Sequence, residues 1–271
     1  KNICNIIDAT NFQFIEFDIV NKLNLKIKID FIFHLASLAS PKFYFSKPLE
    51  TLRTGSIGSE NMLELALYNK ARILLASTSE VYGDPQEHPQ KETYFGNVNP
   101  IGKRSVYDES KRYMESIATT YYNEYNVDIK IARIFNTYGP KMRVDDGRAL
   151  PTFLNQGKNN IPYSVFGDGN QTRSFCYIDD TINGLYKLIY SDFNKPINIG
   201  NPFEISINDL IKKINKILKV DNQTNFMEIH ENDPKKRKPD ISLAIKKLKW
   251  KPIISLDEGI KLTLNHYEKK K

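Results

Sequence analysis

Two groups of residues between positions 77 and 111 have the types and spacing needed for proton transfer. Tyr107 and Lys111 are four positions apart, so a helix would place both side chains on one face. A lysine ammonium beside a tyrosine favours the phenolate, and the tyrosine can then act as a base well below its ordinary pKa of about 10. Three residues near the start of the stretch supply two hydroxyl groups and a carboxylate: Thr78, Ser79 and Glu80.

A parallel sheet is the element that would bring these two groups together. Thr78 follows an apolar run, residues 73–76, that is typical of a buried parallel strand. The other elements predicted in this half are strands at 12–20, 29–35 and 129–135 and helices at about 48–69 and 107–126. Strands that alternate with helices favour a doubly wound α/β fold, whose ligands bind at the carboxyl ends of the strands.

The second half of the chain predicts a smaller α/β part. An amphipathic helix is expected at 206–218, with Ser206 as its N-cap. Further elements are predicted as helices at 149–157 and 179–190, helices ending at Leu248 and beginning at Leu256, and strands at 163–166 and 196–199. We expect the two parts to span residues 1–140 and 141–271, interleaved around 175–200.

The composition argues against several other classes of protein. The 271 residues carry a net charge of +7, but this excess accompanies a general bias toward Lys, Asn and Ile, so no nucleic-acid partner is predicted. Cys4 and Cys176 form no metal-ligand or disulfide framework, which fits a reducing cytoplasm. No apolar run approaches about 18 residues, and no secretory leader is visible, so neither a membrane span nor secretion is expected. Four histidines lack metal-ligand spacing, and no metal site is predicted: His34, His88, His230 and His266.

Six motifs, in this order, resemble a known family. They are STSEVYGD, YDESK, ARIFNTYGP, DGNQTRSFCYIDD, INIGNP and DPKKRKPD. Each motif alone is weak evidence, because a tyrosine four residues before a lysine occurs by chance in many helices. Together, from about Asn11 to Tyr267, they are similar to the extended short-chain dehydrogenase/reductases, and within these to the UDP-glucuronate decarboxylases.

This resemblance implies a Rossmann-type protein that holds NAD and converts UDP-glucuronate into UDP-xylose and CO2. It implies that Tyr107 takes the proton of the sugar 4-hydroxyl while NAD takes the C4 hydride, and that Lys111 lowers the pKa of Tyr107 and contacts the cofactor ribose. The resulting 4-ketone is β to the carboxylate, so CO2 leaves and the bound NADH then reduces the ketone. Glu80 and Arg237 would flank the reacting centre, steering the carboxylate and the return of a proton to C5.

The resemblance also assigns binding roles. Thr78 would hydrogen-bond the 4-hydroxyl, with Ser79 beside it. The implied cofactor contacts, besides Tyr107 and Lys111, are Asp18, Ile19, Leu35, Ser37, Thr54, Ala76, Thr137 and Arg143. The implied substrate contacts are Arg53, Asn61, Tyr121, Asn136, Arg173 and Arg237; arginine suits a diphosphate because its fork donates two bonds at once. Helices near 58–69 and 108–125 would form a four-helix homodimer interface, which sequence alone does not separate from an internal core.

The residue before Glu80 distinguishes branches of the family. A nucleotide-sugar 4,6-dehydratase carries an Asp-Glu pair after the threonine, whereas this chain has Ser79, which removes the acid that would expel the 6-hydroxyl. A 4-epimerase usually lacks the glutamate. Decarboxylation is therefore favoured, with another nucleotide-sugar dehydratase or epimerase as the alternative.

The start of the chain departs from the family pattern. The family begins with a strand and a GxxGxxG turn that cradles the NAD pyrophosphate, whereas the first glycine here is Gly55. Residues 1–20 match what should follow the second strand, so we expect that about 30 residues are missing, through a truncated sequence or a real loss. A catalytically silent nucleotide-sugar-binding paralogue therefore stays open. Gly55 also stands where the family generally has asparagine.

Overall fold

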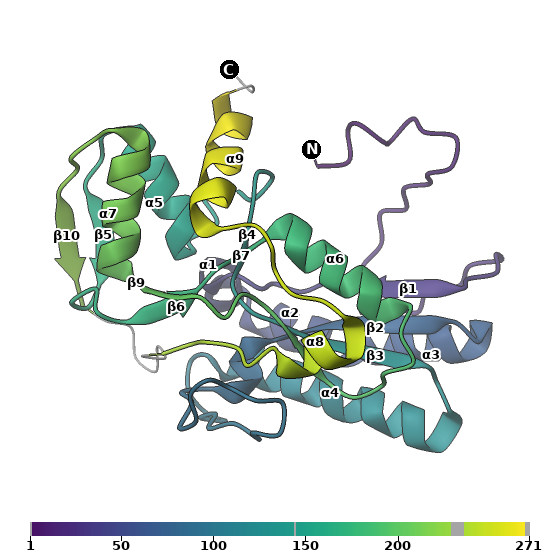
Figure 1. Cartoon of the computed structure of the whole chain (residues 1–271). Coiled ribbons are helices and arrows are strands. Elements are labelled where there is room, and N and C mark those ends of the chain that lie inside the picture. Colours follow the sequence, from purple (N-terminus) through teal and green to yellow (C-terminus); the bar gives the residue numbers. More distant parts are fainter. Residues whose placement is uncertain (1, 144, 229–235, 269–271) are drawn as a thin grey trace.

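The computed structural model describes residues 2–143, 145–228 and 236–268 (Figure 1). His230 and the first three residues of the DPKKRKPD motif lie outside the described residues. Within the described ranges, no helix is both long and apolar enough to cross a membrane.

A four-stranded parallel sheet forms the centre of the first part of the molecule. Its strands, in order across the sheet, are β1 (Phe31–His34), β2 (Arg72–Thr78), β3 (Ile129–Ile134) and β8 (Ile197–Ile199). Every neighbouring pair runs parallel. The α/β fold class and the parallel sheet expected from the sequence are confirmed.

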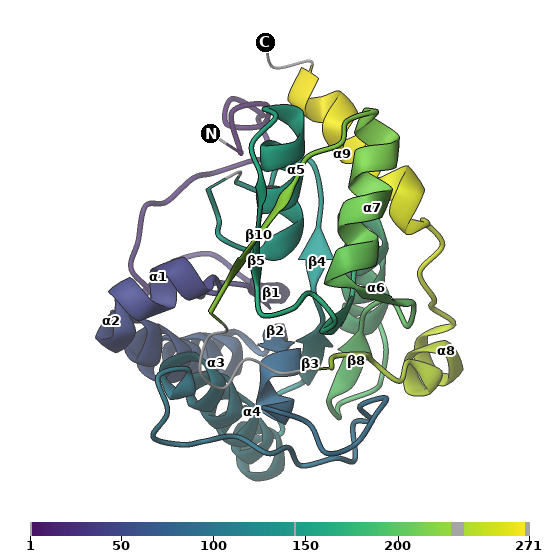
Figure 2. The ribbon, with the colours of Figure 1, turned by 90° about the vertical axis from the view of Figure 1, so that its left-hand side faces the viewer.

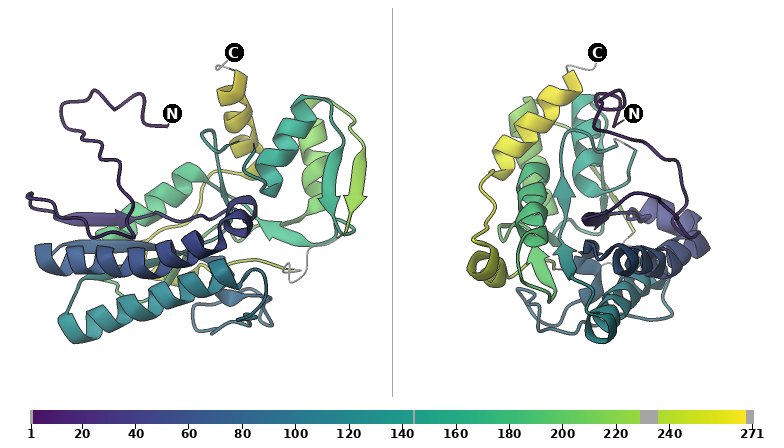
Figure 3. Two further views of the ribbon diagram at one scale, coloured as in Figure 1. Left: turned by 180° about the vertical axis from the view of Figure 1, so that it is seen from behind. Right: turned by 90° about the vertical axis from the view of Figure 1, so that its right-hand side faces the viewer.

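The strand predicted at residues 12–20 was wrong. Residues 2–30 contain neither helix nor strand. The N-terminal part of this segment extends away from the sheet (Figure 3), whereas Ile19, Leu23 and Ile29 pack against the core around α3 and α4. Phe14 and Phe17 are about half exposed, at 55% and 40%. A strand needs a hydrogen-bonded neighbour, and this apolar segment has none among the described residues.

Helices cover both faces of the sheet (Figures 1 and 2). On one face lie α3 (Ser59–Asn69) and α4 (Ser105–Tyr125), and on the other lie α6 (Ile178–Ile189) and α8 (Ser242–Leu248). Along β2, Ile73 and Leu75 pack with the first pair, whereas Leu74 packs toward α6 and Trp250. Burial on both faces explains why β2 is a continuous apolar run rather than an alternating one.

The helical region predicted at 48–69 is divided into three segments. These are α2 (Pro48–Arg53), a π-helical turn at Thr54–Gly58, and α3; the short helix α1 (Pro41–Ser46), which the sequence did not predict, precedes them. The π turn packs against α4 at Gly55, where a Cβ atom would lie 2.6 Å from the Cβ of Ser110. A side chain at position 55 would therefore require Ser110 and the adjoining turn of α4 to shift.

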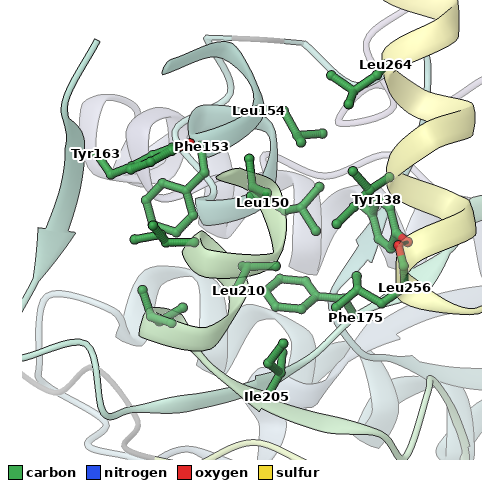
Figure 4. Close-up of a cluster of buried hydrophobic side chains, with 14 of the residues drawn as sticks. Tyr138, Leu150, Phe153, Leu154, Tyr163, Phe175, Ile205, Leu210, Leu256 and Leu264 are labelled. Carbon is green, nitrogen blue, oxygen red and sulfur yellow. Dashed lines mark hydrogen bonds between the residues drawn. The ribbon is translucent and has the colours of Figure 1, made fainter. Parts of the chain in front are cut away.

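The second part has its own apolar core (Figure 4). Its helices are α5 (Ala149–Lys158), α7 (Ile207–Leu218) and α9 (Leu256–Glu268), beside the parallel pair β5 (Tyr163–Phe166) and β10 (Thr224–Met227). Two short strand pairs join this part to the sheet, β4 (Thr137–Tyr138) with β7 (Cys176–Tyr177) and β6 (Thr172–Ser174) with β9 (Glu204–Ser206). Ser206 is the expected N-cap, since its Oγ accepts a 3.0 Å hydrogen bond from the Asp209 amide.

Three elements that follow residue 140 pack in the first part of the molecule and not in the second. Helices α6 and α8 and strand β8 belong to the core of the central sheet, although all three lie beyond residue 140. The division of the chain into two domains at residue 140 stays a prediction.

The contact between Gly55 and Ser110 allows a test of packing behind the site. We expect Gly55→Ala to lower the free energy of unfolding by about 1–3 kcal/mol, because the new methyl group would overlap Ser110. In the double variant, Ser110→Gly removes the overlap and should restore most of the lost free energy of unfolding. About 1 kcal/mol should remain lost, because glycine is unfavourable inside a helix. Urea unfolding of both single variants and the double variant measures the coupling; purely additive losses would contradict this account.

Candidate active site

The carboxyl ends of β1, β2 and β3 open into one pocket of about 670 Å³. This volume is in the range of small-molecule sites, about 300–1,000 Å³. Residues that follow the three strands lie in its wall: Leu35, Ser37, Ser79, Glu80, Phe135 and Asn136. The pocket therefore lies where a doubly wound sheet binds its ligands.

Tyr107 and Lys111 lie in the first part of α4 and are buried against the end of β2. They are 6% and 2% exposed. Lys111 Nζ donates a 2.7 Å hydrogen bond to the main-chain oxygen of Ala76 and lies 5.9 Å from the centre of the Tyr107 ring. Burial lowers the pKa of Lys111 to about 8. The helix thus brings the pair to the pocket, as the four-residue spacing predicts.

The expected lowering of the Tyr107 pKa by Lys111 is not found. Burial raises the pKa of Tyr107 to about 12, and the opposing influence comes first from a hydrogen bond with Thr78. The physical reason is that a fully buried phenolate loses its hydration, while the Lys111 ammonium is directed at a carbonyl oxygen instead of the phenol. In this structure, Tyr107 is a protonated phenol at neutral pH.

Glu80 forms ion pairs with two arginines at the pocket. Its Oε1 lies 2.6 Å from Arg237 Nη1, and its Oε2 accepts a 2.8 Å hydrogen bond from Arg237 Nη2. Arg104 Nη2 also donates to Oε2. Burial by itself would raise the pKa of Glu80, but the charges of Arg237 and Arg104 outweigh it and hold this pKa below its ordinary range. Glu80 is therefore an anion at neutral pH.

Arg237 reaches the pocket because the residues after it are hydrogen-bonded to Gln90, in the loop after β2. Gln90, which is fully buried, exchanges main-chain hydrogen bonds with Lys238 and Asp240, at 2.9 and 2.8 Å. The Gln90 side chain also accepts a 2.8 Å bond from the Lys238 amide. The long loop after β2 thus holds the C-terminal segment against the carboxyl edge of the sheet.

The structure brings together most of the residues that the resemblance assigned to the site. Those lining the pocket are Leu35, Ser37, Ala76, Thr78, Ser79, Glu80, Tyr107, Lys111, Asn136, Thr137, Arg173 and Arg237. Arg173 is 9% exposed, and the Thr137 hydroxyl bonds to that of Thr181 at 3.0 Å. Their roles remain predictions, but their convergence follows from the fold.

Seven assigned residues lie outside the lining of this pocket: Asp18, Ile19, Arg53, Thr54, Asn61, Tyr121 and Arg143. The side chain of Asn61 donates to the main-chain oxygens of Ile19 and Val20, at 2.9 and 3.0 Å. Tyr121 packs against the α3–α4 core. Arg143 is bound to Asp145 at the surface, and Arg53 is exposed at the end of α2. Their binding roles stay predictions, and Asn61 has a structural role that the sequence did not suggest.

Two pocket residues that directly contact Tyr107 or Glu80 were not singled out by the sequence analysis. Tyr44 stacks on Tyr107, with ring centres 5.3 Å apart and planes 8° from parallel. Its hydroxyl is buried without a hydrogen-bond partner among the described residues. Arg104 contacts Glu80 from the residue before α4. The only sequence signal for Arg104 was its position three residues before Tyr107, which places it on the adjoining turn.

No group of three or more metal-ligating side chains lies together in the described part of the chain. The polar side chains that line the pocket supply hydroxyls, two amides (Asn136 and Gln171), one carboxylate, guanidinium groups and an ammonium.

Comparison with known proteins identifies relatives of this chain. Residues 2–263 match the family model described as GDP-mannose 4,6 dehydratase. The chain is 44% identical over 269 residues to UDP-glucuronic acid decarboxylase 1 of Xenopus tropicalis, covering 99% of this chain and 63% of the relative. It is 46% identical over 261 residues to UDP-glucuronic acid decarboxylase 6 of Arabidopsis thaliana, covering 96% of this chain and 76% of the relative. The chain thus spans less than two thirds of the Xenopus relative.

A solved structure shares the fold over the whole chain. It is the UDP-glucuronic acid 4-epimerase from Bacillus cereus, crystallised with UDP-glucuronic acid and NAD. The TM-score is 0.89 and the identity 28%, and the match covers 100% of this chain and 86% of the epimerase chain. This Rossmann-type neighbour confirms the fold predicted from the sequence.

The ion pairs of Glu80 predict a pH-dependent loss of stability in Arg104→Met. Because the pKa of Glu80 is lowered on folding, its ionised form stabilises the protein above its unfolded pKa of about 4.5, and this contribution is lost as the pH falls. Removing one of its two guanidinium partners should cost about 1–3 kcal/mol near pH 7 and less near pH 4. Urea unfolding at both pH values, with the exposed neighbour Lys103→Met as control, measures this; an equal cost at both would contradict it.

Proposed function

Since the chain belongs to the UDP-glucuronic acid decarboxylases, a branch of the extended short-chain dehydrogenase/reductase family, we propose that it converts UDP-glucuronate into UDP-xylose and CO2 with NAD as its cofactor.

The observation that carries this proposal is the contact between Glu80 and Arg237. These residues are 157 positions apart, yet their side chains meet in the wall of the pocket that contains Tyr107. A decarboxylase must hold a substrate carboxylate beside the sugar ring while the ring is oxidised. Arg237 and Arg173 supply guanidinium groups, which bind carboxylates and phosphates through paired hydrogen bonds.

Tyr107 and Thr78 would carry out the proton transfer at the sugar 4-hydroxyl. Tyr107 would accept the proton of that hydroxyl, and the Thr78 hydroxyl, which already influences the pKa of Tyr107, would hold the sugar oxygen in place. When bound, NAD supplies hydride transfer at C4 in both directions. The 4-ketone lies β to the carboxylate, so the C5–C6 bond can break with its electron pair delocalised onto the ketone oxygen.

The donor groups of the pocket fit part of NAD. Ser37 and Thr137 offer hydroxyls and Lys111 an ammonium, all at the carboxyl edge where such sheets bind a dinucleotide. We propose that these residues, with Leu35 and Ala76, hold the cofactor. Asp18, Ile19, Thr54 and Arg143, which the resemblance assigns to the same ligand, do not line the described pocket.

The test is an NMR time course of this chain with UDP-glucuronate and added NAD. We expect UDP-xylose to appear. Formation of the C4 epimer of UDP-glucuronate would instead support the second candidate, a UDP-glucuronate 4-epimerase, which the similarity to the Bacillus cereus enzyme favours. Binding of UDP-glucuronate without any product would indicate a catalytically silent relative and would refute the proposed activity of this chain.

Tyr107→Phe is the sharpest single change for the proposed mechanism. It removes the proton acceptor while keeping the ring that stacks on Tyr44, so we expect turnover to fall by about 10²-fold or more with nucleotide-sugar binding retained. Kinetics and calorimetry on the same preparation separate the two effects. The matched control is Tyr113→Phe, on the same helix but outside the pocket lining. Unchanged turnover in Tyr107→Phe would remove Tyr107 from its proposed role.

We also propose a cytoplasmic location. The two cysteines, Cys4 and Cys176, are both free thiols, which suits a reducing compartment.

We further propose that the chain acts as a homodimer through α3 and α4. The π turn and the two helices expose apolar side chains, among them Ile57 at 44%, Tyr113 at 44% and Tyr125 at 57%.

A charge in this surface should separate the subunits. We expect light scattering to give the mass of two chains for the wild type and of one chain for Tyr113→Glu, because an unpaired carboxylate cannot be buried cheaply in an apolar interface. Phe226→Glu, on β10 at 61% exposure, is the control. A wild-type chain that is monomeric at the same concentrations would refute the proposed dimer.

A further inference from the structure

A second, smaller cavity lies beside Glu80. Its volume is about 190 Å³, and its walls come from the long loop after β2 and from the first turn of α4. Glu80 and Arg104 line both this cavity and the larger pocket, so these two residues lie between them. One water needs roughly 10–15 Å³ on this measure, so the cavity has room for several waters.

Asp108, the residue after Tyr107, lines this cavity and has no part in the proton and hydride transfers at C4. It is 5% exposed, and its Oδ1 has no hydrogen-bond partner among the described residues. Its Oδ2 lies 3.9 Å from Arg104 Nε, and Arg104 in turn contacts Glu80. A buried carboxyl oxygen without a partner is costly, and the adjoining cavity has room for water that can hydrogen-bond to it.

We propose that Asp108 holds a proton and relays it from water in the small cavity, past Arg104 and Glu80, to the reacting centre. This inference rests on the proposed function, because it assigns the source of a proton that decarboxylation requires.

The proton balance of the reaction requires such a source. When CO2 leaves, the C5–C6 bond breaks and its electron pair moves into the enolate of the 4-ketone. A C5–H bond must then form with a new proton. The proton that Tyr107 accepts from the 4-hydroxyl returns to that same oxygen when the ketone is reduced, so it is not available to C5. Each turnover therefore takes one proton from solvent.

The surroundings of the two carboxyl groups place this proton on Asp108. Burial raises the pKa of Asp108 to about 7, and the nearby negative charge of Glu80 adds to the rise. Arg237 and Arg104 hold the pKa of Glu80 low, so it stays ionised while its neighbour is protonated. The titratable and charged groups whose fields act between Asp108 and its surroundings are Glu80, Arg104, Arg237, Glu109, Tyr44 and Tyr107.

The experiment compares Asp108→Asn with Glu109→Gln, its neighbour in α4, which is outside both cavities and pairs with Arg112. Infrared spectra of the ligand-free proteins are recorded from about pH 5 to about pH 9 to find the C=O stretch of a protonated carboxyl group. We expect a band that disappears with a midpoint near pH 7 in the wild type and in Glu109→Gln. The band should be absent from Asp108→Asn.

Turnover of UDP-glucuronate is measured on the same proteins. We expect Asp108→Asn to lose about 10²-fold in turnover, with release of a UDP-4-keto sugar and little change in KM, because oxidation proceeds while protonation at C5 fails. Glu109→Gln should match the wild type. Asp108→Ser serves as a second variant should the asparagine not fold.

The outcomes separate this inference from the proposed function. The relay is overturned if the wild type lacks the infrared band near neutral pH, or if Asp108→Asn keeps full turnover with an unchanged pH profile. In either case, UDP-xylose formation by the wild type would leave the proposed function standing. A wild type that forms no UDP-xylose overturns the proposed function and the relay's role in it. The infrared band alone still decides whether Asp108 is the protonated carboxyl group.

Discussion

The ionised carboxylate of Glu80 is the constraint on which the rest of the site depends. Moving an ion of this size out of water costs several kcal/mol, and the cost is offset only where partners of opposite charge are held in good geometry. Arg104 and Arg237 provide those partners from two segments far apart in the sequence. The protein must therefore assemble the end of β2, the residues before α4 and the C-terminal segment at one point, or leave a charge buried without compensation.

Gln90 shows how this requirement extends beyond the pocket. It forms an isolated parallel bridge with the segment around Pro239, and its neighbour in space, Asn198, donates to the main-chain oxygens of Gln90 and Asp240 at 3.0 and 2.9 Å. These bonds tie the loop after β2, strand β8 and the segment of Arg237 into one unit. The long loop after β2 is therefore the support that places Arg237 on Glu80.

Residues with local signals were predictable from the sequence, and residues that depend on tertiary contacts were not. The apolar run of β2 and the spacing of Tyr107 and Lys111 specify their elements directly, so the sheet and the approach of this pair to the pocket followed from pattern alone. The segment 12–20 has an equally strandlike pattern but no paired neighbour among the described residues, which no local pattern reveals. Tyr44 and Arg104 have no motif of their own and become functional candidates only through contacts with Tyr107 and Glu80.

The pKa of Tyr107 in the free protein also differs from the expectation that Lys111 lowers it, and this difference bears on how the site works. Spacing established that Lys111 is close, but the balance between burial and charge depends on where the ammonium is directed, and it is directed at the Ala76 oxygen. Burial raises the pKa of Tyr107 to about 12, so the free protein holds very little of the phenolate at neutral pH.

Lys111 does not counteract the rise in the Tyr107 pKa, and burial lowers its own pKa to about 8. The ligand must therefore change the electrostatics of the pocket, either by bringing positive charge or by offering the phenolate a hydrogen bond that the free protein lacks. Bound NAD would supply such a positive charge locally, because its nicotinamide ring is cationic when oxidised and neutral when reduced. Tyr107 beside that ring would then favour the phenolate when a proton must be accepted and the phenol before the proton is returned.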